Sequence, residues 1–295
     1  NISSVLELRS FNLPPEAVFP AFLFATLSYM VILFCNLVLI SVIVLNKSLH
    51  QPMYMILLNL PVNDLIGSSA LFLQVIKDIL TKSRTIHYSS CVTQAFFIHI
   101  YAGGTVFILT AMAYDRYIAI CNPLKYNTIM THAHIFRIIT CLWLTNVALM
   151  SVLFFLLLRL PRCRSVLTHP YCDQPSLLAL VCADVTVNNI YGLLTVALTQ
   201  VIANVTIMYT YLQILVACFG SKQPDTKHKA LQTCATHLIV FLLLECFVYV
   251  ANTVGFYFSI DVRILLTLLY SLVPPAVNPF IYCFKTQDIK KILMK

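Results

Sequence analysis

Two acidic residues lie inside long apolar stretches of the chain. Asp64 falls about halfway through the apolar run 53–76, and Glu245 is the only acidic or strongly basic residue of the run 230–260. A carboxylate this deep in a bilayer is costly unless it is protonated, paired or bound to an ion. Each residue is therefore a candidate functional group whose partner has to be identified.

Asp64 can be interpreted in two ways. If the apolar runs form a helix bundle, Asn36 and Asn278 are its candidate neighbours. The three side chains would then make a polar core that acts as a switch network and could hold a sodium ion. Alternatively, Asp64 is a hydrogen-bonded core acid without a function of its own.

A second group of charges stands at the end of the apolar run 88–114, where Asp115 and Arg116 are followed by Tyr117. By itself, this tripeptide could simply anchor a helix at the membrane boundary. His132 and His134 form a weak metal-binding pattern in a predicted loop. We interpret these histidines as structural and expect no metal site.

Catalytic motifs do not accompany these residues. The sequence has no HExxH, no glycine-rich phosphate loop and no GxSxG. We therefore predict that the chain is not an enzyme and needs no cofactor. Residues 264–284 contain no lysine, which disfavours covalent retinal, and two deep charges are too few for a proton wire or an obvious pore.

The composition indicates which elements must position these residues. The chain has 295 residues, of which 60% are hydrophobic and 10% are charged, whereas soluble domains carry about 25% charged residues. A span needs roughly 20 apolar residues to cross a bilayer. Seven runs qualify, namely 18–45, 53–76, 88–114, 138–158, 185–219, 230–260 and 264–284. We therefore predict an all-α membrane protein, a seven-transmembrane helix bundle that forms one domain over residues 1–295.

The loops suggest how this bundle is oriented. Lys and Arg residues are more numerous on the side that is cytoplasmic if residues 1–17 lie outside. Asn1 begins a glycosylation acceptor, which agrees with an outer N-terminus. Residues 286–295 place apolar side chains on one side and lysines on the other, which predicts a short amphipathic helix on the cytoplasmic surface of the membrane. Because the basic residues sit in short loops, we expect no nucleic-acid partner.

Four of the 11 cysteines fall on the predicted outer side, Cys91, Cys163, Cys172 and Cys182. The outside is oxidising, so an even number of cysteines there indicates disulfides. Four cysteines allow three pairings, and their spacing does not choose among them. The other seven cysteines are interpreted as small buried apolar residues.

Four motifs give the chain a specific resemblance. They are LHQPMY at residues 49–54, MAYDRYIAICNPL at 112–124, KALQTCATHL at 229–238 and PPAVNPFIY at 274–282. In this order and spacing they resemble the signature of vertebrate odorant receptors, which are rhodopsin-like (class A) G-protein-coupled receptors. The resemblance covers essentially the whole chain.

The resemblance implies roles for individual residues. Arg116 would be held by local partners and released on activation to meet a G-protein α subunit, and Tyr211 and Tyr282 would swing inward at that step. The full set of implied activation residues is Asp115, Arg116, Tyr117, Tyr211, His237, Asn278, Pro279 and Tyr282. The implied partner is a heterotrimeric G protein of the stimulatory, olfactory type, with cyclic AMP as output. The implied disulfides join Cys91 to Cys172 and Cys163 to Cys182, which would pin residues 159–184 over the pocket.

By the same resemblance, a small-molecule odorant would bind among the third, fifth and sixth helices, in the outer half of the bundle. The implied lining residues are Ile98, His99, Ala102, Gly103, Gln174, Gly192, Thr195, Val196, Thr199, Glu245, Val248, Tyr249 and Asn252. We expect the ligand to be polar and the receptor to lie in the plasma membrane. Two alternatives remain, a rhodopsin-like receptor that acts outside the nose and a seven-helix channel or transporter.

Glu245 departs from the resembling family, which commonly has an aromatic residue there. Three interpretations are open. Glu245 could be the counter-ion of a cationic ligand, could pair with His99, or could be protonated because burial favours the neutral carboxyl. Thr105 is a second departure, since family members often have an acid there, and a sodium site near Asp64 would be weaker or absent as a result.

Overall fold

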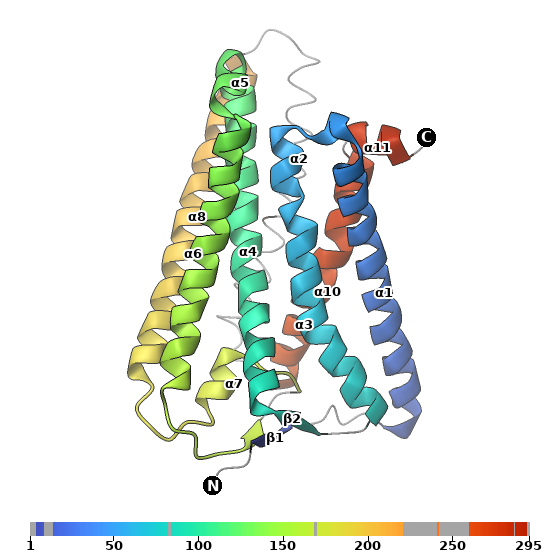
Figure 1. Cartoon of the computed structure of the whole chain (residues 1–295), viewed down its shortest axis with the longest axis vertical. Helices are drawn as coiled ribbons and strands as arrows, with labels where there is room; N and C mark the ends of the chain where they lie inside the picture. Colours follow the sequence, from blue (N-terminus) through green and yellow to red (C-terminus); the bar gives the residue numbers. More distant parts are fainter. Residues whose placement is uncertain are drawn as a thin grey trace.

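The computed structural model describes residues 4–8, 14–81, 84–167, 170–220, 241, 260–285 and 287–293. These residues form a bundle of long helices with a small β-sheet at one end and the C-terminal helix at the other (Figure 1). We call these the sheet end and the α11 end. The predicted sixth run, 230–260, lies outside the described residues except for Phe241 and Ile260.

Among the described residues, five helices are long and apolar enough to cross a membrane. They are α1 (Pro15–Leu45), α2 with α3 (Pro52–Leu57 and Asn59–Thr81), α4 (Tyr88–Cys121), α6 (His132–Leu158) and α8 (Thr186–Gly220). The helix α10 (Ile260–Lys285) contains a shorter apolar stretch, Leu268–Cys283. Because α2 and α3 together form one span, these helices cover six of the seven predicted spans.

Large apolar side chains on α1 show why the surroundings of the bundle are lipid. Phe19, Phe24 and Phe34 are each about two-thirds exposed, at 66%, 64% and 70%. A soluble surface rarely carries such a continuous apolar face. A helix in a bilayer gains from this arrangement, because lipid solvates the face that does not contact protein.

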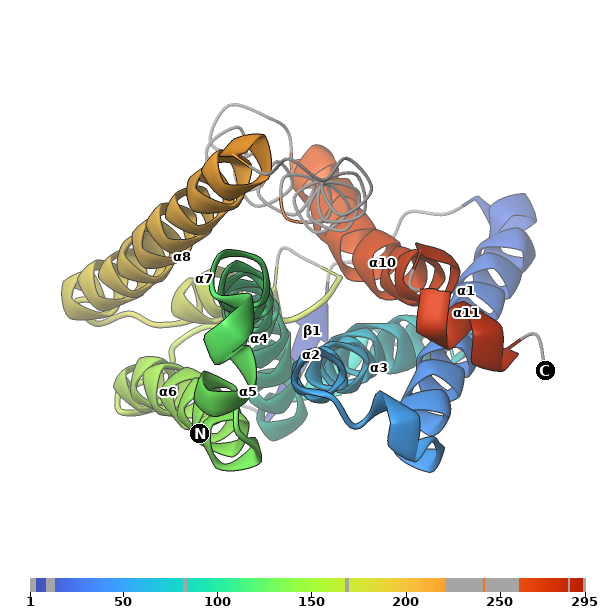
Figure 2. The ribbon, with the colours of Figure 1, turned by 90° about the horizontal axis from the view of Figure 1, so that it is seen from above.

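The helix α4 occupies the middle of the bundle and packs against α3, α6 and α8, as seen from above in Figure 2. α1 packs against α3 and α10, and α10 also contacts α3. Glycines allow the closest approaches. A Cβ at Gly67 of α3 would overlap the ring of Tyr101, and one at Gly104 of α4 would overlap Oδ1 of Asn63. Small residues serve this purpose between membrane helices, where packing replaces the hydrophobic effect as the driving force.

Pro61 explains the break between α2 and α3. Proline has no N–H group, so Pro61 cannot donate to the carbonyl of Leu57, four residues earlier. α2 ends at Leu57 and α3 begins at Asn59. The second predicted span is therefore formed by two helical segments in series.

The sheet end holds three short strands in the order β2-β1-β3. β1 (Val5–Leu8) pairs antiparallel with β2 (Thr85–His87) and parallel with β3 (Val166–Leu167). Leu6 and Ile86 are buried under the sheet. The sequence predicts helices alone, so the sheet is an addition that appears only when three distant segments meet.

The segment after α6 is also ordered by local contacts. It contains β3 and α7 (Gln174–Leu178), whose first turn is closed by a reciprocal capping box between Asp173 and Ser176. Asp184 precedes α8, and its carboxylate accepts hydrogen bonds from the hydroxyl and the N–H of Thr186. These bonds lower the pKa of Asp184, because they favour the charged form.

At the α11 end, two 3₁₀ turns, η1 (Lys47–Leu49) and η2 (Pro123–Lys125), and the short α5 (Tyr126–Ile129) connect the long helices. The predicted C-terminal amphipathic helix is present as α11 (Gln287–Leu293). Ile289 of α11 is fully buried, whereas Lys290 and Lys291 are exposed.

The close packing of α3 and α4 gives a first prediction. Replacing Gly104 with Ala should lower the stability of the detergent-solubilised protein by about 1–3 kcal/mol, because the new methyl group overlaps Asn63. Gly192→Ala is the matched control, since a Cβ there meets Leu153 Cδ1 at 3.5 Å, an ordinary contact. Thermal unfolding measures both variants, and equal midpoints would contradict the proposed close approach.

Candidate functional site

A polar centre lies between α1, α3 and α10. Asn278 donates a hydrogen bond from Nδ2 to Oδ2 of Asp64 over 3.1 Å, and both side chains are buried. The Ser68 hydroxyl donates to the backbone carbonyl of Asp64. The structure thus places Asn278 beside the buried acid, as the sequence suggests.

Asn36 lies in the same region but bonds to backbone carbonyls and not to Asp64. Its Nδ2 donates to the carbonyl of Ile32 on its own helix and to the carbonyl of Pro275 on α10, each over 2.9 Å. Pro279 stands four residues after Pro275 and has no N–H to offer that carbonyl. Asn36 supplies the missing donor, so the proline-containing helix is stabilised by an amide from a neighbour.

A second polar layer joins α3, α4 and α6. Asn63 donates to the carbonyl of Tyr101 and to the hydroxyl of Thr105, each over 2.9 Å. Asn146 of α6 donates to the carbonyl of Ile100 over 2.8 Å. A Cβ at Gly103 would overlap Oδ1 of Asn146, so α4 meets α6 closely at this level.

At the α11 end, Asp115 has two partners. Its Oδ2 lies 3.5 Å from Nη2 of Arg116, and its Oδ1 accepts a hydrogen bond from the Tyr126 hydroxyl over 2.9 Å. Burial and the neighbouring Asp115 carboxylate raise the pKa of Tyr126, so its hydroxyl keeps its proton and remains a donor. Arg116 is therefore held next to a carboxylate that is itself fixed by the following loop.

Tyr211 and Tyr282, the two tyrosines that the resemblance implies in activation, pack at the same end of the bundle as this ion pair. Tyr211 and Tyr282 are both buried and belong to one apolar cluster with Phe241 and Ile289. Tyr117 and Tyr209 have ring centroids 6.0 Å apart. Helices α4, α8 and α10 thus all contribute to the packing around the α11 end.

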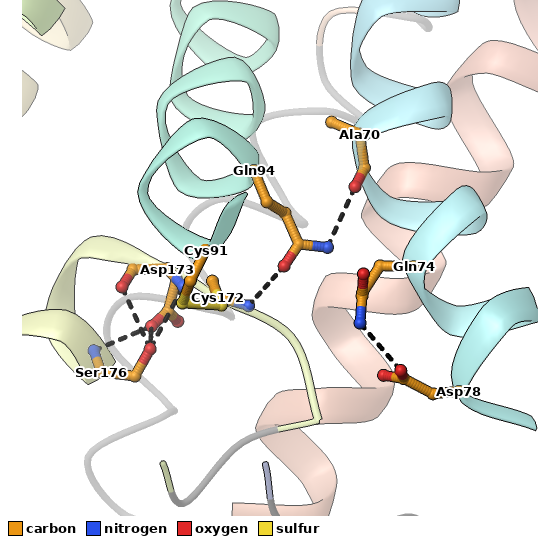
Figure 3. Close-up of a disulfide and its surroundings, with 8 residues drawn as sticks. All are labelled: Ala70, Gln74, Asp78, Cys91, Gln94, Cys172, Asp173 and Ser176. Atoms are coloured by element: carbon orange, nitrogen blue, oxygen red, sulfur yellow. Dashed lines mark hydrogen bonds between the residues drawn. A yellow bond between two sulfur atoms is a disulfide. The ribbon is translucent and has the colours of Figure 1, made fainter. Parts of the chain in front are cut away.

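At the sheet end, disulfides join Cys91 to Cys172 and Cys163 to Cys182. Gln94 supports the first of them, as Figure 3 shows. Its Oε1 accepts from the backbone N–H of Cys172 over 2.9 Å, and its Nε2 donates to the carbonyl of Ala70 over 3.0 Å. Residues of the segment between α6 and α8 are thereby tied to both α3 and α4.

The predicted pocket residues fall into groups at this end. Gln174 is buried at the start of α7, and its Nε2 lies 4.0 Å from the position of a Cβ on Gly192. Thr195 is only 7% exposed, whereas Val196 beside it is 48% exposed. Gln174, Gly192 and Thr195 therefore share one region, and Val196 lies on a different side of α8.

The remaining predicted pocket residues lie mainly on α4. His99 bonds the carbonyl of Ala95 through Nδ1 over 2.8 Å, and its ring meets the ring of Phe154 edge-on. Ile98 packs instead near the cluster of Leu71 and Tyr171. Ala102 is half-buried, Gly103 faces Asn146, and the Thr199 hydroxyl donates to the carbonyl of Thr195.

Several predicted residues lie outside the described part of the chain. They are Asn1, His237, Glu245, Val248, Tyr249 and Asn252. Within the described residues, no group of three or more His, Cys, Asp or Glu side chains is placed to hold a metal ion. Thr131 caps α6, because its hydroxyl accepts a hydrogen bond from the backbone N–H of His134.

Comparison with known proteins identifies this arrangement. A profile of the family described as olfactory receptor matches residues 25–295. Human olfactory receptor 52D1 is 39% identical, over 90% of this chain and 86% of that receptor. Human olfactory receptor 10A3 is 31% identical, over 100% of this chain and 95% of that receptor. This chain belongs to the olfactory receptor family.

Mouse olfactory receptor 4E2 is also similar, at 31% identity over 90% of this chain and 86% of that receptor. The resemblance drawn from the four motifs is therefore confirmed, and the fold is the seven-transmembrane helix bundle of G-protein-coupled receptors. As an olfactory receptor, the chain is a multi-pass membrane protein of a receptor family rather than an enzyme family.

Some residues of this olfactory receptor that shape the site were not singled out from the sequence. Tyr126 stands two residues after the motif at 112–124, and its partner Asp115 is eleven positions away. Asn63 directly precedes Asp64, yet its hydrogen bonds go to α4. An asparagine inside an apolar run is a usable signal, because a buried amide needs partners, but the sequence does not tell which helix provides them.

The bond between Asn36 and Pro275 gives a second prediction. Asn36→Ala should cost about 1–3 kcal/mol, because it leaves a buried carbonyl of α10 without a donor. Asn204→Ala is the control, since Asn204 donates a hydrogen bond to the carbonyl of Gln200 on its own helix. Thermal unfolding in detergent compares them, and an equally small loss for both would show that the Asn36 bond does not stabilise the bundle.

Proposed function

We propose that this olfactory receptor lies in the plasma membrane with its sheet end and residues 1–17 outside. The proposed ligand is a small polar organic odorant, bound in the outer half of the bundle. On binding, the receptor activates a heterotrimeric G protein of the stimulatory, olfactory type and raises cyclic AMP. The observation that carries this proposal is the restrained Arg116 at the α11 end, opposite a disulfide-tied sheet end.

The orientation is supported by redox chemistry. Both disulfides belong to the sheet end, and disulfides persist on the oxidising side of a membrane. Residues 286–295 then lie on the cytoplasmic side, where Lys290 and Lys291 of α11 can meet anionic lipid headgroups. Asn1 would be outside and available for glycosylation.

The ligand region is supported by packing. The segment that contains α7 is held over the bundle by Cys91–Cys172 and by Gln94. Beneath it, Gln174 and Gly192 approach each other, and His99 lies on the neighbouring face of α4. Ligand pockets typically combine apolar walls with a few convergent polar groups. The remaining proposed contacts are Ile98, Ala102, Gly103, Thr195, Val196, Thr199, Glu245, Val248, Tyr249 and Asn252.

The G protein would be contacted at the opposite end of the bundle, the α11 end. In the structure, Arg116 is paired with Asp115, and Tyr126 holds Asp115 from the loop. Release of Arg116 would free a guanidinium to donate hydrogen bonds to carbonyl groups at the C-terminus of the G-protein α subunit. Asp115, Tyr117, Tyr211, His237, Asn278, Pro279 and Tyr282 are the proposed supporting residues.

The polar centre would couple the two ends. Asp64 and Asn278 are bonded to each other, and Asn36 is bonded to the same helix as Asn278. A shift of α10 would have to exchange these hydrogen bonds, since none of the groups can reach water inside the bilayer. We propose that these three side chains form the switch network.

The proposed output is tested by measuring cyclic AMP in cells that express the receptor. The stimuli are amines, amino acids, acids and steroid-like odorants, and Arg116→Ala is the control. We expect at least one class to raise cyclic AMP in the wild type and the response to be lost in Arg116→Ala. A full response in Arg116→Ala at equal surface expression would overturn the proposed coupling.

The restraint on Arg116 gives a separate prediction. Tyr126→Phe should raise basal cyclic AMP by up to about fivefold, because removal of one hydrogen bond of roughly 1 kcal/mol loosens Asp115. Tyr191→Phe is the control, since it removes a tyrosine bond to the carbonyl of Leu149 in the other half of the bundle. Unchanged basal signalling in Tyr126→Phe would show that the loop does not restrain Arg116.

Glu245 is tested by its own substitution. If it is the counter-ion of a cationic odorant, Glu245→Gln should lower the potency of an amine agonist at least tenfold, because the buried charge pair is lost. If Glu245 pairs with His99 or is protonated, the amine potency should stay within a factor of about two. Dose–response curves of cyclic AMP distinguish these outcomes.

A further inference from the structure

A buried asparagine near the sheet end has no hydrogen-bond partner among the residues that the structure describes. Asn188 lies in the first turn of α8 and is 0% exposed, and both its Oδ1 and its Nδ2 lack a partner. Buried amide groups in proteins are almost always paired with protein or with water. Two unpaired atoms on one side chain therefore point to a partner that is not part of the described protein, either water or a polar group of a ligand.

Asn188 faces the interior of the bundle. It is followed at spacings of four and three residues by Gly192 and Thr195, so the three share one face of α8. The residues beside it, Val187 and Ile190, are 52% and 54% exposed and lie on the outward side. The buried face of α8 is thus the one that carries the unpaired amide.

The next turn of α8 is packed less tightly on this face than the glycine contacts between α3, α4 and α6. A Cβ on Gly192 would meet only Leu153 Cδ1 at 3.5 Å and Gln174 Nε2 at 4.0 Å. A Cβ on any of Gly67, Gly103 or Gly104 would instead overlap a neighbouring side chain. Among the glycines described in this way, Gly192 is therefore the one that could accept a methyl group without displacing its surroundings.

The polar groups on this face are uncharged and can both donate and accept hydrogen bonds. Asn188 offers two N–H donors and a carbonyl acceptor, and the nearby Gln174 side chain is of the same kind. Leu153 and Gly192 add apolar surface. A ligand head that places a donor and an acceptor in one plane would satisfy both atoms of Asn188, whereas an ammonium group would satisfy the acceptor alone.

We infer that Asn188 is a specificity-determining residue of the odorant site and that it recognises the planar amide-type head of a neutral ligand with an apolar tail. This inference rests on the proposed ligand region at the sheet end and names its ligand class. Gln174 provides a second amide to the same head. Leu153, which lies opposite Gly192, provides apolar surface for the first carbons of the tail.

The test uses the purified full-length receptor in detergent and measures thermal stabilisation, which does not require a G protein. The probes are butanamide, hexanamide and octanamide, with 1-hexanol and hexylamine as head-group controls. The variant is Asn188→Leu, and the matched control is Asn189→Leu, at the exposed neighbouring position. Asn188→Leu should fold, because replacing an unpaired buried amide by an apolar group of similar size is close to neutral.

We expect hexanamide to stabilise the wild type and Asn189→Leu more than 1-hexanol or hexylamine does. Asn188→Leu should weaken the apparent affinity for hexanamide by about tenfold or more, as expected for two lost hydrogen bonds. Asn188→Asp retains the acceptor and loses the donors, so it should shift the preference from hexanamide to hexylamine. A purely structural role of Asn188 would not move this preference.

Three results would overturn the inference. They are hexanamide affinity in Asn188→Leu within twofold of the wild type, a wild-type preference for hexylamine or 1-hexanol, and no stabilisation by any of the amides. Cyclic AMP measured in parallel separates this inference from the proposed function. Amide stabilisation without cyclic AMP supports the site and contradicts the coupling, whereas cyclic AMP responses to other odorants without amide binding do the reverse.

Discussion

The bundle depends on asparagine amides that donate to backbone carbonyls of neighbouring helices. Lipid offers a polar group no hydrogen-bond partner, so a polar group inside the bilayer gains strongly from a partner within the protein. Asn36 bonds the Pro275 carbonyl, and Asn63 and Asn146 bond successive carbonyls of α4 at Tyr101 and Ile100. Each of these bonds joins two helices, and together they fix how α1, α3, α4, α6 and α10 sit against one another.

The same constraint explains the closeness of the packing. An asparagine side chain is short, so the helices it joins must approach, and glycine makes that approach possible. Gly104 stands against Asn63, and Gly103 stands against Asn146. The middle of the bundle is thus closely packed, because its polar bonds and its glycine contacts support each other. The two ends are held by different means, by disulfides and Gln94 at the sheet end and by the hydrogen bond from Tyr126 to Asp115 at the α11 end.

The difference between the bonds at the centre and the bonds at the α11 end bears on how the receptor could change conformation. The pairs at the α11 end are few and involve side chains that can exchange partners, whereas the centre is held by backbone carbonyls. Asp64 and Asn278 lie in the centre of the bundle, but their hydrogen bond joins two side chains, as the bonds at the α11 end do. The proposed ligand region and the proposed coupling region are therefore joined by a core in which the side-chain pairs are the parts able to rearrange.

The sequence by itself determined the family and the membrane spans that the structure describes, and it singled out Asp64 and Arg116 as candidate functional residues. These follow from apolar run lengths, from charges placed where they are costly and from motifs that are contiguous in the chain. The tertiary structure alone decided the β-sheet, the partner of Tyr126 and the carbonyls that accept hydrogen bonds from Asn36, Asn63 and Asn146. It also decided that Asn188 has no hydrogen-bond partner among the described residues. The physical reason is that a sequence shows which groups need a partner, while only the packing of helices far apart in the chain determines which partner each group meets.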